Sequence, residues 1–177
     1  MKRTSAALGS FAFLLVTPGT VCGLVPLLIT GWRRPGDPVP WVDALGWLLV
    51  LAGGAVLLHA FVAFAWQGRG TPAPSAPTER LVVEGAYRHV RNPMYVAVLA
   101  LVLGQVLLFA SGGLFAYLVV LGITVDVFVH TYEEPTLREA YGPIYEEFCE
   151  SVPRSLPRLT PWQGATRRQS RDVADQR

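Results

Sequence analysis

The sequence predicts an all-α, polytopic membrane protein with about four transmembrane helices, followed by a cytoplasmic C-terminal helical segment. Composition is the first observation behind this prediction: the 177 residues are 51% hydrophobic and only 16% charged, whereas soluble domains carry about 25% charged residues. The second is the grouping of apolar residues into stretches that match the length of about 20 residues needed to cross a bilayer. We expect one membrane domain over residues 1–162 and a polar, disordered tail over residues 163–177.

The apolar stretches give the predicted spans in order. Tryptophans close both ends of the second stretch, as is typical of side chains at membrane interfaces. The stretch from residue 94 to 129 is too long for one crossing, and Ser111-Gly112-Gly113 supplies a turn in its middle. It therefore predicts a tight hairpin of two helices. The four predicted spans are residues 6–30, 41–66, 94–110 and 114–130.

The basic residues predict the orientation of these spans. With an even number of spans, both termini and the 67–93 loop share one side of the membrane. All but two of the 15 lysines and arginines fall on that side: two before the first span, four in the loop and seven from residue 138 onward. The positive-inside rule then places the N-terminus, the 67–93 loop and the C-terminus in the cytoplasm, with residence in the cytoplasmic membrane. Orientation explains these arginines, so we predict no nucleic-acid partner.

Two further patterns concern packing and the C-terminal segment. Pro135 is expected to end the fourth span and to start a new helix. Apolar residues then recur at helical spacing up to residue 148, which predicts an amphipathic segment that lies on the membrane or packs over the loop. Glycines at positions 46, 53 and 54 favour close helix packing within or between chains, which leaves the oligomeric state open.

The polar segment of residues 79–95 separates the second and third spans. Asn is a good N-cap and Pro fits the first helical position, so Asn92-Pro93 predicts a helix start that presents free backbone N–H groups. Because the last two spans form a hairpin, the start of the third and the end of the fourth lie side by side. We therefore expect the Glu133-Glu134 pair to lie within reach of four residues of this segment, namely Tyr87, Arg91, Asn92 and Tyr95.

These residues also have non-catalytic interpretations. Arg91 suits contact with lipid headgroups, and Tyr87 and Tyr95 suit anchoring at the membrane interface. Asp126 lies inside a predicted span with His130 four residues later, which fits a functional pair and an interfacial ion pair equally. The cysteines and histidines show no metal-binding spacing, so we predict no metal.

Three motifs in order carry a family resemblance: G-A-Y-R-H-V-R-N-P-M-Y, then E-E-P-T-L-R-E-A-Y-G-P-I-Y-E-E-F after an apolar hairpin, then V-P-R-S-L-P. Over residues 79–157 the chain resembles the isoprenylcysteine carboxyl methyltransferases and the related phospholipid methyltransferases. The resemblance implies an integral-membrane methyltransferase that uses S-adenosylmethionine and takes a lipophilic small molecule or lipid from the bilayer.

The resemblance also implies roles for individual residues. Cofactor contacts fall on Arg80, Leu81, Val82, Tyr87, Asn92, Pro93, Met94, Tyr95 and Glu133. Catalytic candidates are Arg91, Glu134 and His130, the last two as bases if the acceptor is an amine or hydroxyl. The chain departs from the family pattern at Asn92, where His is common, and at Val129, where the eukaryotic isoprenylcysteine enzymes place a substrate-binding arginine.

Three alternatives accompany the leading interpretation. A phospholipid N-methyltransferase would methylate phosphatidylethanolamine. A membrane reductase would use NADPH in place of S-adenosylmethionine. A membrane binding or scaffold protein would keep the fold without turnover, but it would not need Tyr87, Asn92, Tyr95 and Glu133 together.

Overall fold

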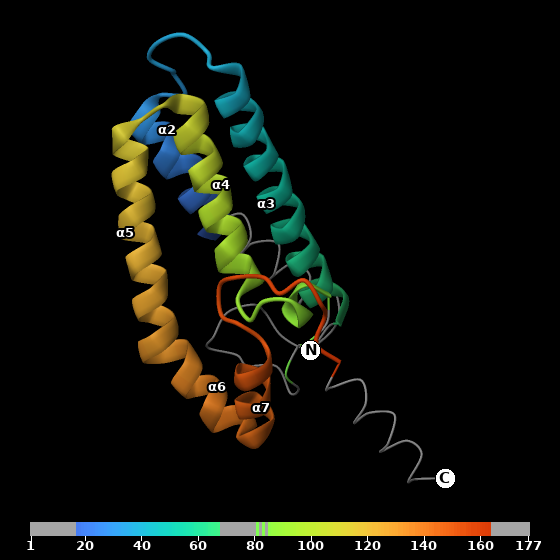
Figure 1. Ribbon diagram of the computed structural model, residues 1–177. Coiled ribbons are helices and arrows are strands. Elements are labelled where there is room, and N and C mark those ends of the chain that lie inside the picture. The colour runs from blue at the N-terminus through green and yellow to red at the C-terminus, as the bar shows by residue number, and fades with distance from the viewer. Residues whose placement is uncertain (1–16, 68–80, 82, 84, 164–177) are drawn as a thin grey trace.

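The computed structural model describes residues 17–67, 81, 83 and 85–163, and no strand occurs among them. The prediction of an all-α fold is confirmed (Figure 1). The start of the predicted first span, Arg80, Val82 and residues 164–177 of the predicted tail lie outside the described residues. The elements in chain order are η1 (Thr20–Leu24), α2 (Val25–Thr30), α3 (Pro40–Gln67), η2 (Gly85–Arg88), α4 (Pro93–Phe109), α5 (Gly112–Phe128), η3 (Val129–Glu133), α6 (Glu134–Tyr141) and α7 (Pro143–Ser151).

Apolar helices make up most of the described structure. Two continuous stretches, Pro40–Ala60 and Gly112–Tyr141, are long and apolar enough to cross a membrane, and Thr17–Thr30 and Pro93–Phe109 are shorter apolar helices. Large apolar side chains on the two long helices point outward; Leu51 on α3, for example, is 67% exposed. Such faces would be costly in water, so they indicate association with a membrane.

Helices α3 and α4 approach so closely that only glycine fits between them. A Cβ atom added at Gly104 would lie 2.6 Å from the carbonyl oxygen of Gly46, and one added at Gly53 would lie 2.8 Å from that of Ala97. The sequence prediction of close packing is thus confirmed, within the chain, for Gly46 and Gly53. Gly54 faces open space.

Two π-helical turns each lie directly before a proline. The backbone N–H of Val25 donates to the carbonyl of Thr20, and that of Glu134 donates to Val129, so both turns span five residues. A proline has no N–H and its ring clashes with the carbonyl four residues earlier. At Pro26 and at Pro135, the wider π turn makes room for the proline ring and lets the helix continue without the missing hydrogen bond.

The expectation that Pro135 ends the helix is therefore wrong. The backbone keeps right-handed helical angles through η3 into α6, and Gly112–Tyr141 forms one continuous helix. The true interruption comes at Gly142, whose φ of 52° separates α6 from α7.

The carbonyls that the first π turn frees are bonded by polar side chains from two other helices. The hydroxyl of Tyr117 on α5 donates to the carbonyl of Val21 at 3.0 Å. The side-chain amide of Gln105 on α4 donates to Cys22 at 2.9 Å, and Cys22 is the residue that loses its helical partner at Pro26. Buried backbone carbonyls need hydrogen-bond partners, so these two bonds replace the ones that the irregular turn removes.

The hairpin between α4 and α5 is shorter than predicted. Ala110 adopts the left-handed conformation that ends α4, and the Ser111 hydroxyl accepts a hydrogen bond from the N–H of Leu114 as the N-cap of α5. Gly112 and Gly113, expected in the turn, already belong to α5. Ser111, rather than the glycines, sets the position of the turn, because its side chain caps α5 directly.

Helices α6 and α7 lie at the end of the bundle where α3 ends and α4 begins (Figure 1). Tyr145, Phe148 and Val152 form a buried apolar cluster, and Leu81, Val83 and Trp162 pack against it. We expected the C-terminal segment either to lie on the membrane or to pack over the polar loop, and in the structure it packs against that loop.

Candidate functional site

The hinge, residues 85–92, leads into α4. It consists of the η2 turn and a short link, and α4 begins at Pro93, as predicted. Asn92 occupies the N-cap position, but its side chain makes no capping hydrogen bond. The first turn of α4 thus keeps backbone N–H groups without a side-chain cap, and the Asn92 amide is not used for capping.

A second segment, the strap of residues 152–162, lies along the hinge. Four backbone hydrogen bonds of 2.9 to 3.4 Å join the two segments. They run from Arg91 to Pro153, from Asn92 to Arg154, from Arg158 to His89 and from Trp162 to Arg88. The arginine side chain of residue 88 adds a bond of 2.7 Å to the carbonyl of Trp162. The strap therefore fixes the conformation of the hinge at the entrance to α4.

Tyr95 and Glu133 form the first side-chain pair of the site. The Tyr95 hydroxyl, in the first turn of α4, donates a hydrogen bond of 2.7 Å to Oε2 of Glu133 at the end of η3. Tyr87 lies near the same carboxylate: burial, and to a lesser extent the charge of Glu133, raises the pKa of the Tyr87 phenol above its usual value. The phenol stays neutral at physiological pH. The hairpin argument placed these residues together, and the structure does so.

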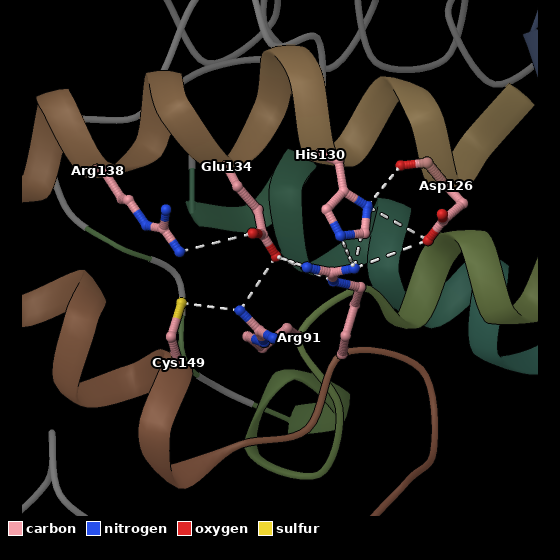
Figure 2. A network of polar contacts seen from close by, with 7 residues as sticks. Arg91, Asp126, His130, Glu134, Arg138 and Cys149 are labelled. Atoms are coloured by element: carbon pink, nitrogen blue, oxygen red, sulfur yellow. Dashed lines mark hydrogen bonds and ion pairs between the residues drawn. The ribbon is translucent and has the colours of Figure 1, made fainter.

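Glu134 is the centre of an ion-pair network. Its side chain is only 7% exposed, and its carboxylate lies 3.2 Å from Arg91 Nη1 and 2.8 Å from Arg154 Nη2. Arg138, one turn further along α6, lies 3.8 Å away. Figure 2 shows this carboxylate between guanidinium groups from three segments. A buried carboxylate needs such partners to remain charged.

Arg91 connects this network to α7. Its Nη1 also donates to the Cys149 thiol at 2.8 Å (Figure 2). Its Nε is buried and, among the residues that the structure describes, has no hydrogen-bond partner. An orphaned donor on a buried cation is costly unless an acceptor joins it, so this atom points to a site for an anionic or carbonyl oxygen.

An exposed cluster continues the network along η3 and α5. His130 Nδ1 lies 3.0 Å from the carbonyl of Asp126 and 3.4 Å from its carboxylate. Arg154 Nη1 lies 2.6 Å from His130 Nε2 and 3.7 Å from the Asp126 carboxylate. The Asp126 and His130 side chains are 64% and 49% exposed. The structure thus brings the two side chains of this pair together, and Arg154 extends the cluster toward Glu134.

The remaining candidate residues lie in packed regions. Leu81 packs against the cluster formed by Tyr145, Phe148 and Val152. Pro93 is fully buried, and Met94 packs against Leu57 and Ala97 between α3 and α4. These side chains contribute to packing around the site.

Sequence reasoning missed Arg154 and Cys149 as members of the site. Arg154 belongs to the motif V-P-R-S-L-P, but that motif lies 20 residues beyond Glu134 and has no helical periodicity to indicate a partner. Cys149 belongs to no motif in the sequence that indicates a partner. Its place near Arg91 follows from the packing of α7 against the hinge, which no local pattern encodes.

One of three comparisons with known proteins identifies a family. The family model described as "Phospholipid methyltransferase" matches residues 41–144. The match includes α3, which the resemblance over residues 79–157 did not include, and it ends at the start of α7. No curated protein and no solved structure matches the chain. Because the match covers more than half of the chain, the protein belongs to the phospholipid methyltransferase family.

Proposed function

We propose that this protein transfers a methyl group from S-adenosylmethionine to a lipophilic acceptor in the membrane. The observation that carries the proposal is the pair of contacts Tyr95–Glu133 and Arg91–Glu134, which lie where the start of α4 meets the junction of η3 and α6. In a chain of a methyltransferase family, these are the groups available to bind a polar cofactor beside an apolar helix bundle. The acceptor then approaches from the bilayer.

The residues present fit this cofactor. The unpartnered Nε of Arg91 and the uncapped start of α4 suit a carboxylate. The Glu133 carboxylate suits ribose hydroxyls or an ammonium group, and the ring faces of Tyr87 and Tyr95 suit a sulfonium cation. When bound, the cofactor supplies an activated methyl group. The chain's own residues then orient the acceptor and exclude water, which is where most of the acceleration of such a displacement arises.

The proposal includes a membrane topology. We place four spans across the cytoplasmic membrane, so that the shorter helices Thr17–Thr30 and Pro93–Phe109 cross together with the two longer ones. The hinge and the strap lie on the cytoplasmic side. The concentration of arginines around Glu134 at this end of the bundle supports that orientation. A cytoplasmic site also has access to a soluble cofactor.

Phospholipid N-methylation is the second candidate, because the family match carries that description. Val129 stands where an isoprenylcysteine enzyme would place its substrate arginine, which weakens the case for a prenylcysteine carboxylate.

One assay tests the reaction and separates the two candidates. The full chain in detergent receives S-adenosylmethionine with a tritiated methyl group, together with vesicles of phosphatidylethanolamine or of a total membrane lipid extract. Label in the phosphatidylethanolamine headgroup establishes N-methylation, and label only in the extract establishes another lipophilic acceptor. A protein that binds the cofactor and labels neither contradicts the proposal.

A further inference from the structure

Methylation of an amine, an alcohol or a phenol requires a group that accepts a proton, and the site offers two candidates near the end of α5. Glu134 is unsuited to this role. Its side chain is 7% exposed, and its oxygens lie within 4 Å of three guanidinium groups. Protonation would leave Arg91, itself only 14% exposed, without its carboxylate partner. Glu134 therefore acts as a fixed counter-ion.

His130 has the geometry of a base. Its Nδ1 faces two acceptors, the carbonyl oxygen of Asp126 at 3.0 Å and the Asp126 carboxylate at 3.4 Å, and one donor, Arg154 Nη1, at 3.1 Å. Because both acceptors lie at Nδ1 and the donor lies closer to Nε2 than to Nδ1, we assign the hydrogen to Nδ1, and Nε2 of the neutral ring keeps its lone pair. This assignment agrees with the approach of a donor, Arg154 Nη1, to Nε2 at 2.6 Å.

Arg154 marks the position that a substrate donor would take. Its Nε and Nη2 lie 3.0 and 2.8 Å from Oε1 of Glu134, so two of its nitrogens are held by the buried carboxylate. Only Nη1 points to His130. An N–H or O–H group of an acceptor that enters from the exposed side can replace Nη1 at Nε2, while Arg154 remains bound to Glu134.

We propose that His130 is the proton acceptor of this enzyme, that Asp126 positions its ring, and that the methyl acceptor is an amine, alcohol or phenol rather than a carboxylate. The inference rests on the proposed methyl transfer. Two residues separate His130 from Glu133 within the same π turn, so the ring belongs to the same segment as the proposed cofactor site. Its side chain is 49% exposed on a helix that is long and apolar enough to cross a membrane.

The proton and electron balance of the step is simple. The lone pair of the acceptor nitrogen or oxygen forms the new bond to the methyl carbon, while the methyl–sulfur bond breaks and its electron pair stays on sulfur. The proton of the acceptor passes to Nε2 of His130, which releases it to water. A carboxylate acceptor would already lack this proton and would need no base.

The first test needs no turnover. Nitrogen NMR of the full chain in detergent, with ¹⁵N-labelled histidine, reports which ring nitrogen carries hydrogen. His130→Gln identifies the signal, because the chain has only three histidines. We expect hydrogen on Nδ1 of His130 and a weaker preference for Nδ1 in Asp126→Ala, which removes the carboxylate and keeps the backbone carbonyl. A wild-type ring with its hydrogen on Nε2 overturns the proposal.

The second test measures kcat/KM against pH with tritiated S-adenosylmethionine and the membrane lipid extract, together with cofactor affinity by equilibrium dialysis. General bases contribute about 10²- to 10⁴-fold, so His130→Gln should lose that factor and keep wild-type cofactor affinity. The wild-type pH profile should have a limb whose midpoint matches the NMR titration of His130. The charged groups that face His130 are Asp126 and Arg154, and Glu134 lies on the other side of Arg154. Thr131→Ala, an exposed neighbour in the same turn, is the matched control and should retain activity.

Two results of these assays overturn the role of His130. One is full activity in His130→Gln. The other is a methylated product that releases methanol in alkali, because such a product is an ester formed from a carboxylate. A wild-type protein that binds no S-adenosylmethionine refutes the proposed function instead, so the two failures are distinguishable.

Discussion

Replacing Glu134 with alanine should destabilise the protein strongly. The change removes the carboxylate that lies between Arg91, Arg154 and Arg138. The three pairs contribute unequally: Arg138 is 55% exposed and its pair is screened by solvent, whereas Arg91 is 14% exposed. Removing one partner of a buried pair costs about 3–5 kcal/mol. Most of this cost should come from leaving Arg91 without its carboxylate partner, and a smaller share from Arg154.

Thermal unfolding in detergent, followed by tryptophan fluorescence, measures this cost. For a chain of this size about 1 kcal/mol corresponds to roughly 2–4 °C, so Glu134→Ala should lower Tm by roughly 6–20 °C. Glu139→Ala is the matched control, because Glu139 is an exposed carboxylate on the same helix. Equal Tm values for the two variants would refute the view that Glu134 anchors the hinge and the strap.

Two further predictions concern the helix bundle. Gly104→Ala would place a Cβ 2.6 Å from the Gly46 carbonyl, so it should lower the free energy of unfolding by about 1–3 kcal/mol as α3 and α4 separate. Gly54→Ala is the control: its Cβ would meet nothing within 4 Å, so it should be neutral or slightly stabilising in the same unfolding assay. Tyr117→Phe removes the bond to the carbonyl of Val21 and should cost roughly 1 kcal/mol, the typical net contribution of an intramolecular hydrogen bond. A Tyr117→Phe protein with wild-type Tm would show that this carbonyl finds another partner.

The parts of the structure that the sequence predicts are those set by short-range rules. Asn92-Pro93 starts α4 because the cap position and the first helical position each favour one of these residue types. The hairpin then brings Tyr95 to Glu133 without any knowledge of the tertiary structure, since two helices joined by a tight turn must place those ends side by side.

The parts that the sequence did not predict depend on tertiary packing. Arg154 reaches Glu134 because backbone hydrogen bonds hold the strap along the hinge, and no periodic pattern in the strap encodes that contact. The effect of Pro135 was predicted wrongly for a related reason. Proline removes one helical hydrogen bond, but a single π turn restores continuity, and the sequence does not show which outcome is favoured.

The central claim is that the Tyr95–Glu133 pair holds S-adenosylmethionine, and equilibrium binding to the detergent-purified chain tests it most directly. Binding of S-adenosylmethionine and of its demethylated product is measured beside NADPH, with Glu133→Gln as the variant and Glu139→Gln as the control. A charge-assisted hydrogen bond contributes about 1.5–3 kcal/mol, so Glu133→Gln should weaken binding by roughly 10- to 150-fold, and Glu139→Gln should not change it. A folded protein that binds NADPH but not S-adenosylmethionine, or equal affinity in both variants, would contradict the account.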